Sequence, residues 1–243
     1  MKKVFYSLLL VAILQIIIST LAIPEYILPK PSDVVIYFIN NFQTLLIDTI
    51  YTLSAAFIAL IIATILGITI AIAMDLSTTF KSIVNPIVYF SQLIPAIVLA
   101  PLLIIWLGFG YITTITLIVI MCAFPIITST YNGLINIDPD TLFQFKLIKA
   151  SNYQLYRHLK LPGSINQIFI GLKIATTYSI TSALLAEFMG AQHGLGVSVA
   201  TSLASFNTTN IFCIITITTT FTYLSLKALN KIESRLTKYE KIN

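Results

Sequence analysis

Residues 82–137 read SIVNPIVYFSQLIPAIVLAPLLIIWLGFGYITTITLIVIMCAFPIITSTYNGLINI and contain no aspartate, glutamate, lysine or arginine. A soluble domain with such a stretch would expose large apolar patches, whereas a lipid bilayer accepts it. One transmembrane helix needs about 20 predominantly apolar residues, so the stretch is too long for a single helix. The glycines of Gly108-Phe109-Gly110 divide it. We therefore predict two membrane-spanning helices, near 84–107 and near 112–135.

The rest of the chain has the same apolar character. Of its 243 residues, 57% are hydrophobic and 9% are charged, against roughly a quarter charged in an ordinary soluble domain. Four further spans are predicted, at roughly 4–23, 46–74, 170–190 and 209–227. The first follows a basic start and resembles a signal peptide, but its apolar run exceeds the usual ~7–15 residues, so we expect a retained helix. The predicted fold class is all-α: one polytopic membrane domain, residues 1–243, with about six transmembrane helices.

The basic residues are distributed asymmetrically between the loops of this topology. With the N-terminus in the cytoplasm, Lys30 is the only one of the 14 lysines and arginines assigned outside, and Lys173 sits at the cytoplasmic end of the fifth span. Cytoplasmic loops carry an excess of such residues. We therefore predict a multi-pass protein of the cell (plasma or inner) membrane with both termini cytoplasmic. The net charge of +5 then reflects orientation and nearby anionic lipid, and nucleic acid is not an expected partner.

Residues 136–162 form the only sizeable cytoplasmic loop of this topology. Asp138-Pro139 has the residues of a helix start, with an acceptor at the cap and proline at the first position. A second start follows, where Ser151 and Gln154 have the spacing of a capping box. We expect two short helices with a break near Lys149-Ala150, the second ending at Pro162. This pattern fits either helices that lie on the membrane surface or a rigid segment that contacts a partner.

The order of features after this break resembles that of binding-protein-dependent ABC permeases. The matching residues are Lys149-Ala150-Ser151, Leu161-Pro162, Gly171-Leu172-Lys173-Ile174-Ala175, Ala186-Glu187 and Gly194-Leu195-Gly196. Leu28-Pro29-Lys30-Pro31-Ser32 and the run from Ile94 to Gly110 are similar to the nitrate, sulfonate and taurine branch of that family. The chain departs from the family where Phe143-Gln144-Phe145 stand for Glu-Ala-Ala and Lys149 for glycine. Without this glycine, the segment lacks the residue that adopts a tight turn at the lowest cost.

The resemblance implies a type I, MetI-like permease fold and the role of membrane subunit in an ATP-driven importer. Implied partners are cytoplasmic ABC ATPase subunits, an extracytoplasmic solute-binding protein and a second copy of the permease. Loop 136–162 would be the coupling loop, with the ATPase contacts assigned to Lys149, Ala150, Ser151, Gln154, Leu155, Arg157, Leu159 and Pro162. None of the nine glycines is followed by lysine, so a Walker A phosphate loop is missing. We expect no enzymatic activity in this chain, with ATP hydrolysis in a partner.

Polar side chains within the spans are candidates for the substrate pathway. We assign Gln92, Tyr178, Ser182 and Glu187 to it, with helix–helix packing as the alternative for each hydroxyl. Glu187 has three possible roles: substrate contact, pairing with a neighbouring helix, or a place at the outer interface, and a structural role is favoured. Two prolines in the third span, Pro95 and Pro101, predict a broken helix, which is tolerated where the backbone is packed in protein or lines a cavity.

Other classes of function fit the sequence less well. A membrane enzyme would need clustered catalytic groups, but the acids are scattered, so no catalytic residue is assigned. His158 and His193 are far apart and both cysteines lie in apolar runs, so neither a metal nor a cofactor is expected. An ATP-independent secondary transporter leaves the coupling-type loop unexplained. For the substrate, the motifs around 171–179 and 186–191 resemble importers of vitamin precursors such as hydroxymethylpyrimidine or riboflavin; nitrate, alkanesulfonate or taurine is the alternative.

Overall fold

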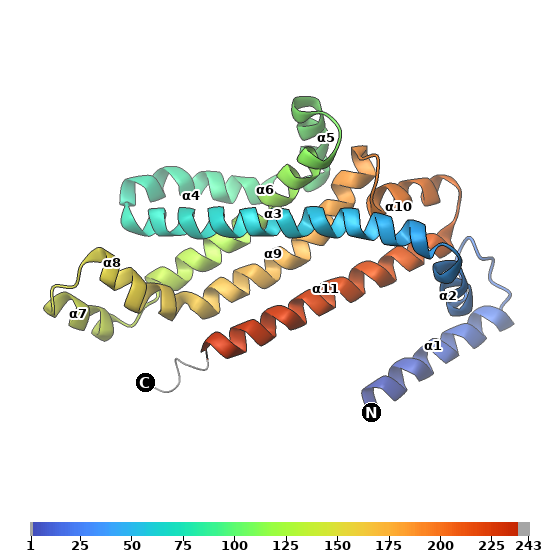
Figure 1. Cartoon of the computed structure of the whole chain (residues 1–243), viewed down its shortest axis with the longest axis horizontal. Coiled ribbons are helices and arrows are strands. Elements are labelled where there is room, and N and C mark those ends of the chain that lie inside the picture. The colour runs from blue at the N-terminus through green and yellow to red at the C-terminus, as the bar shows by residue number, and fades with distance from the viewer. Residues whose placement is uncertain (1, 238–243) are drawn as a thin grey trace.

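A computed structural model describes residues 2–237, and within them the side chains of residues 2–5, 7, 8 and 10 are not described. Lys2, Lys3, Lys238 and Lys241, which count toward the predicted orientation, lie outside the described side chains. The described chain is helical (Figure 1), with the elements α1 Lys2–Thr20, α2 Pro31–Asn40, α3 Phe42–Leu76, α4 Thr78–Leu93, α5 Ala96–Leu107, α6 Tyr111–Ile135, α7 Pro139–Leu147, α8 Asn152–Leu155, η1 Tyr156–Lys160, α9 Leu161–Gly190, α10 Leu195–Ala204 and α11 Thr208–Leu236.

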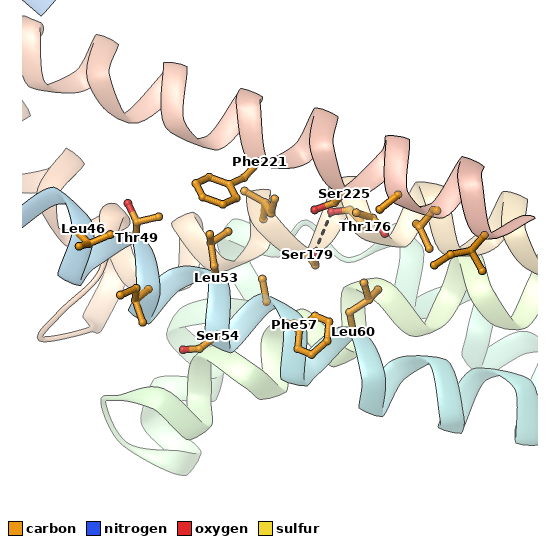
Figure 2. Close-up of a pocket in the computed structure, with 16 residues that line it drawn as sticks. Leu46, Thr49, Leu53, Ser54, Phe57, Leu60, Thr176, Ser179, Phe221 and Ser225 are labelled. Carbon is orange, nitrogen blue, oxygen red and sulfur yellow. Dashed lines mark hydrogen bonds between the residues drawn. The ribbon is translucent and has the colours of Figure 1, made fainter. Parts of the chain in front are cut away.

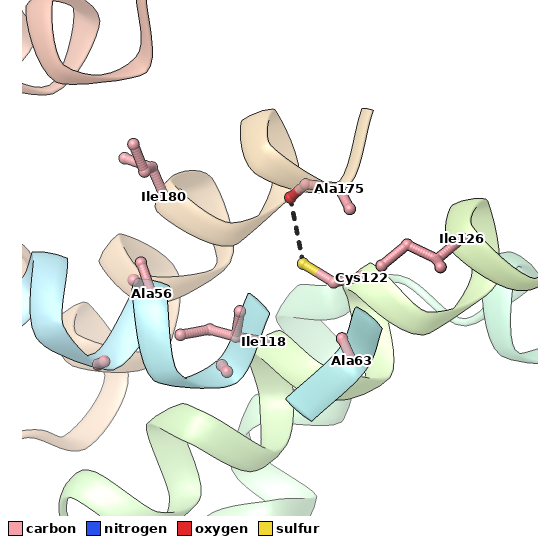
Figure 3. Packing of buried hydrophobic residues seen from close by; sticks show 10 residues of the cluster. Ala56, Ala63, Ile118, Cys122, Ile126, Ala175 and Ile180 are labelled. Carbon is pink, nitrogen blue, oxygen red and sulfur yellow. Dashed lines mark hydrogen bonds between the residues drawn. The ribbon is translucent and has the colours of Figure 1, made fainter. Parts of the chain in front are cut away.

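The core lies where α3, α6 and α9 pack against one another. The face of α3 that enters the core repeats a small residue at every fourth position: Ala55, Ala59, Ala63, Gly67 and Ala71, all buried. Small residues at helical spacing let two backbones approach closely in a membrane, where lipid is as apolar as the side chains. Opposite them, the thiol of Cys122 donates a hydrogen bond to the carbonyl oxygen of Ala175 at 3.2 Å (Figure 3).

The predicted span near 84–107 is not one straight helix. It consists of α4 and α5, which meet at an angle of 105°. The break falls at Ile94-Pro95, because a proline disfavours helical conformation in the residue before it, and Ile94 is extended. The predicted broken geometry is thus confirmed at Pro95. Pro101 lies inside an unbroken α5.

Within the described residues, four helices are long and apolar enough to cross a membrane: α3, α6, the continuous helix Asn152–Gly190 and α11. The bent pair α4–α5 counts as a fifth. The chain is therefore a multi-pass membrane protein. The first predicted span coincides with α1, but several of its side chains lie outside the description, and its described apolar part covers only Val11–Thr20. A sixth span remains a prediction.

The predicted stop at Pro162 is wrong, because the helix passes through this residue. α8, η1 and α9 follow one another without a break over 39 residues, Asn152–Gly190. Proline lacks an N–H group and clashes with the preceding turn of a regular α-helix. Here the preceding turn is the wider π-helical turn η1, Tyr156–Lys160, so the regular bonding pattern that proline would disrupt is already interrupted before Pro162.

Candidate functional site

Loop 136–162 forms two capped helices, as the sequence predicts. The Asp138 carboxylate accepts hydrogen bonds from the backbone N–H of Thr141 at 3.0 Å and from its hydroxyl at 2.6 Å. These bonds, the hydroxyl first, lower the pKa of Asp138 below its usual value. At the second start, the N–H of Ser151 donates to the Gln154 side chain at 2.8 Å and the N–H of Gln154 donates to the Ser151 hydroxyl at 3.3 Å. Local hydrogen bonds thus fix the N-terminal ends of both helices, so the loop has a defined shape.

The break between these helices is at Lys149, as predicted. Lys149 adopts a left-handed conformation with φ of 52°. The chain is held there by hydrogen bonds from the N–H of Lys149 to the carbonyl of Lys146 at 3.0 Å and from the N–H of Ala150 to that of Phe145 at 3.1 Å. A lysine thus takes up the turn for which glycine is the usual residue.

Several apolar side chains of this loop are not covered by the rest of the chain. Phe143, Leu147, Ile148 and Tyr153 are each more than half exposed. Of the candidate coupling residues, Lys149, Ser151, Gln154 and Arg157 are exposed, whereas Ala150, Leu155, Leu159 and Pro162 are partly buried. An apolar patch with basic neighbours on a short, capped loop has the character of a protein contact surface.

A buried ion pair, which the sequence reading missed, fastens this loop to the core. Asp75, in the last turn of α3, accepts hydrogen bonds from the Tyr156 hydroxyl and from the Lys160 ammonium, the latter at 2.5 Å. The side chains of Lys160 and Asp75 are 15% and 8% exposed. The sequence gives one sign of this ion pair, because Asp75 directly follows a long run without charged residues. Its partner, Lys160, lies 85 residues away and could not be identified from the sequence.

Three of the four candidate pathway residues meet in one pocket. Gln92, Tyr178 and Ser182 line a cavity of about 300 Å³ at the break between α4 and α5, together with Ser91, Ile94, Pro95, Ala96, Ile120, Met121, Phe124 and Thr181. The lining carries an amide, four hydroxyls and two aromatic rings, and no charged group. Such a pocket can hold a small polar solute by hydrogen bonds and ring contacts.

Glu187 is not part of this pocket. Its carboxylate is buried among α3, α9 and α10, where one oxygen accepts from the Thr52 hydroxyl at 2.8 Å and from the N–H of Gly196 at 2.9 Å. The other oxygen has no hydrogen-bond partner. Gly194 is needed beside it, since a Cβ there would lie 2.5 Å from the carboxyl carbon. The Ala186-Glu187 and Gly194-Leu195-Gly196 motifs are thus two halves of one contact.

A second, larger hollow lies between α3 and α11 (Figure 2). It measures about 660 Å³ and is lined mainly by aliphatic side chains with Phe57 and Phe221. Four of its hydroxyls are bonded to carbonyl oxygens of their own helices, at 2.6 to 2.9 Å: those of Thr49, Ser54, Thr176 and Ser179. The groove fits hydrocarbon better than a polar solute. Among the described residues, no group of three or more His, Cys, Asp or Glu side chains is placed to hold a metal ion.

Comparison with known proteins gives a family match over most of the chain. The model of the family "binding-protein-dependent transport system inner membrane component" matches residues 63–236. The formylaminopyrimidine transport permease protein ThiX of Halalkalibacterium halodurans is 28% identical over 242 residues, which cover 99% of this chain and 96% of ThiX. The taurine transport system permease protein TauC of Escherichia coli is 28% identical over 188 residues, covering 77% of this chain and 68% of TauC.

Solved structures show the same fold. An inward-facing structure of the MetNI methionine ABC transporter superposes with a TM-score of 0.73 at 18% identity, covering 81% of this chain and 97% of the matched one. This likeness confirms the predicted MetI-like fold.

Proposed function

Because this chain belongs to the family of binding-protein-dependent transport system inner membrane components, we propose that it passes a small, neutral heteroaromatic solute of the vitamin-precursor type. The coarser role is that of permease in an ABC importer: it works with separate ATPase subunits, which hydrolyse ATP, and with an extracytoplasmic solute-binding protein. The chain itself is not an enzyme.

The observation that carries the substrate proposal is the chemistry of the pocket at the α4–α5 break. The Gln92 amide both donates and accepts hydrogen bonds, as the ring nitrogens and amino groups of a pyrimidine require. Tyr178 and Phe124 offer ring faces in the same cavity. Its volume is at the small end of the range of ligand pockets, roughly 300–1,000 Å³. The name of the relative ThiX, a formylaminopyrimidine permease, supports the same class.

A sulfonate such as taurine is the second candidate, supported by the relative TauC. A sulfonate carries a full negative charge, and burying a charge without a partner is costly. The pocket lining contains neither lysine nor arginine. The uncharged lining therefore favours the pyrimidine over the sulfonate.

We further propose the contacts of the coupling loop and the orientation of the chain. The ATPase would bind the exposed residues Lys149, Ser151, Gln154 and Arg157, while the half-buried Ala150, Leu155, Leu159 and Pro162 hold the helix in place. Loop 136–162 and both termini would then be cytoplasmic. The basic residues of this loop support that orientation by the positive-inside rule.

The test is uptake into proteoliposomes that contain the permease with its co-purified ATPase and binding protein. We expect ATP-dependent uptake of a labelled aminopyrimidine and none of labelled taurine. Gln92→Leu should lower pyrimidine uptake at least about tenfold, because an unpaired polar group on the solute costs ~1–3 kcal/mol. Gln43→Leu, the same change at an exposed residue outside the pocket, is the matched control. Taurine uptake that is insensitive to Gln92→Leu would overturn the substrate proposal.

A further inference from the structure

A contact of Asp75 joins loop 136–162 to the core, and Asp75 is not among the residues that resemble the family. Asp75 lies one residue before the end of α3, and both of its hydrogen-bond donors, Tyr156 and Lys160, belong to the π-helical turn η1. The first and last residues of this turn therefore bind the same carboxylate. π-Helical turns inside α-helices occur frequently at functional sites.

The position of Asp75 is unfavourable for α3 alone. A carboxylate in the last turn of a helix faces the negative end of the helix dipole, and this one is almost fully buried. Burial of an unpaired charge is strongly unfavourable. Lys160 offsets both effects, so the contact specifies where η1 lies against α3.

A second contact ties the other end of the same helix to α3. The Thr52 hydroxyl donates to Glu187, near the end of α9, at 2.8 Å. Between the two contacts, the helix rises by about 40 Å from Lys160 to Glu187, at about 1.5 Å per residue. Along this length α3 and α9 also share the core of small residues around Ala55, Ala59 and Ala175. The core and Glu187 thus hold α3 against the part of α9 that is distant from the loop, whereas Asp75 holds α3 against η1, the turn next to α8.

We propose that Asp75, through Lys160 and Tyr156, is the positioning residue that makes α3 follow the coupling loop in each ATP cycle. This inference rests on the proposed function, since it takes loop 136–162 as the segment that contacts the ATPase. Without the contact, the ATPase still binds and hydrolyses ATP, but the loop moves without carrying α3, and ATP is spent without transport.

The experiment compares uptake of the labelled aminopyrimidine with ATP hydrolysis in proteoliposomes of the whole transporter. The variants are Asp75→Asn, Tyr156→Phe, and the exchange Asp75→Lys with Lys160→Asp. Lys173→Met, which removes the other described ion pair, Lys173–Glu233 at 2.6 Å, is the matched control. Co-purification of the ATPase with each variant is measured first, which tests the proposed function separately.

For Asp75→Asn we expect the ATPase to remain bound and hydrolysis to stay near wild type, while uptake per ATP falls about tenfold, within the range of effects on coupling between sites. Tyr156→Phe should give a smaller fall, and the charge exchange should restore much of the ratio. Uptake per ATP that is unchanged in Asp75→Asn, or uptake and hydrolysis that fall together in step with the yield of folded protein, would overturn the proposal. A wild-type permease that retains no ATPase would instead refute the proposed function.

Discussion

Lys149 holds a backbone conformation that costs an L-residue roughly 1–2 kcal/mol and costs glycine little. Its φ is 52°, and it is exposed, so its side chain contributes little packing. We predict that Lys149→Gly stabilises the turn, by up to about 1 kcal/mol after the greater freedom of glycine in the unfolded chain is deducted. Thermal unfolding in detergent measures the change. Lys146→Gly, in the last turn of α7, is the control and should destabilise. Equal destabilisation by both would contradict the strained turn.

The Glu187 carboxylate connects three helices. Two substitutions of this residue distinguish the contribution of its charge from that of its hydrogen bonds. Glu187→Gln keeps an oxygen that accepts from Thr52 and Gly196. Glu187→Ala leaves the N–H of Gly196 buried without this acceptor, while the Thr52 hydroxyl keeps its bond to the carbonyl of Asp48 at 3.1 Å. We predict a loss of about 1–3 kcal/mol for the alanine variant and a clearly smaller loss for glutamine. The measurement is the fraction of monodisperse protein that remains after heating in detergent. If glutamine is as damaging as alanine, the charge rather than the acceptor is what the contact requires.

At the scale of helices, the fit between α3 and α6 depends on Gly67. A Cβ at this position would lie 2.6 Å from Cγ2 and 2.9 Å from Cβ of Ile126, which is itself fully buried. The helices must therefore move apart, and we predict that Gly67→Ala destabilises the fold by about 1–3 kcal/mol, the usual range for overpacking.

Gly163→Ala is the matched control for this substitution. Its Cβ would meet only the end of the Ile137 side chain, at 2.8 Å, which can turn aside. Heating in detergent should therefore leave Gly163→Ala close to wild type while Gly67→Ala loses its folded fraction earlier. The reverse order would show that α3 and α6 are not held at this distance.

A structural feature could be predicted from the sequence when the residues that determine it are close to one another along the chain. The caps at Asp138 and Ser151 were predicted correctly, because each bond spans three residues. The bend at Pro95 was also predicted, since proline acts on its direct neighbour. Pro162 was misread as a stop, because the π-helical turn that accommodates it leaves no recognised pattern of residue types.

Contacts between residues that are far apart in the sequence could not be predicted from such patterns. Asp75 is an ordinary residue near the end of α3, and Lys160 lies inside the continuous helix Asn152–Gly190. Only the packing of that helix on α3 brings them together. The same holds for the pocket, where Gln92 and Ser182 were assigned as polar groups within spans but not as neighbours. Their meeting depends on the bend between α4 and α5.

At the scale of the whole molecule, the pocket is incomplete in a single chain. The Tyr178 side chain is 44% exposed, and Gln92 and Thr181 are exposed beside it. Polar side chains that face lipid are costly and usually face the interior of a bundle or a cavity. A second copy on this face would remove them from lipid and place two pockets opposite each other, so we predict a homodimer with α4, α5 and α9 at its interface.

An isologous dimer brings a residue near its two-fold axis close to the same residue of the partner. Tyr178→Cys should therefore form an intermolecular disulfide on mild oxidation in membranes, whereas Ile65→Cys, which is exposed on α3, should not. The natural cysteines, Cys122 and Cys213, are both buried and should not interfere. Mass determination in nanodiscs gives an independent count of permease copies. One copy per complex, or crosslinking through Ile65→Cys alone, would place the interface elsewhere and leave the pocket facing lipid, which is incompatible with a pathway at this site.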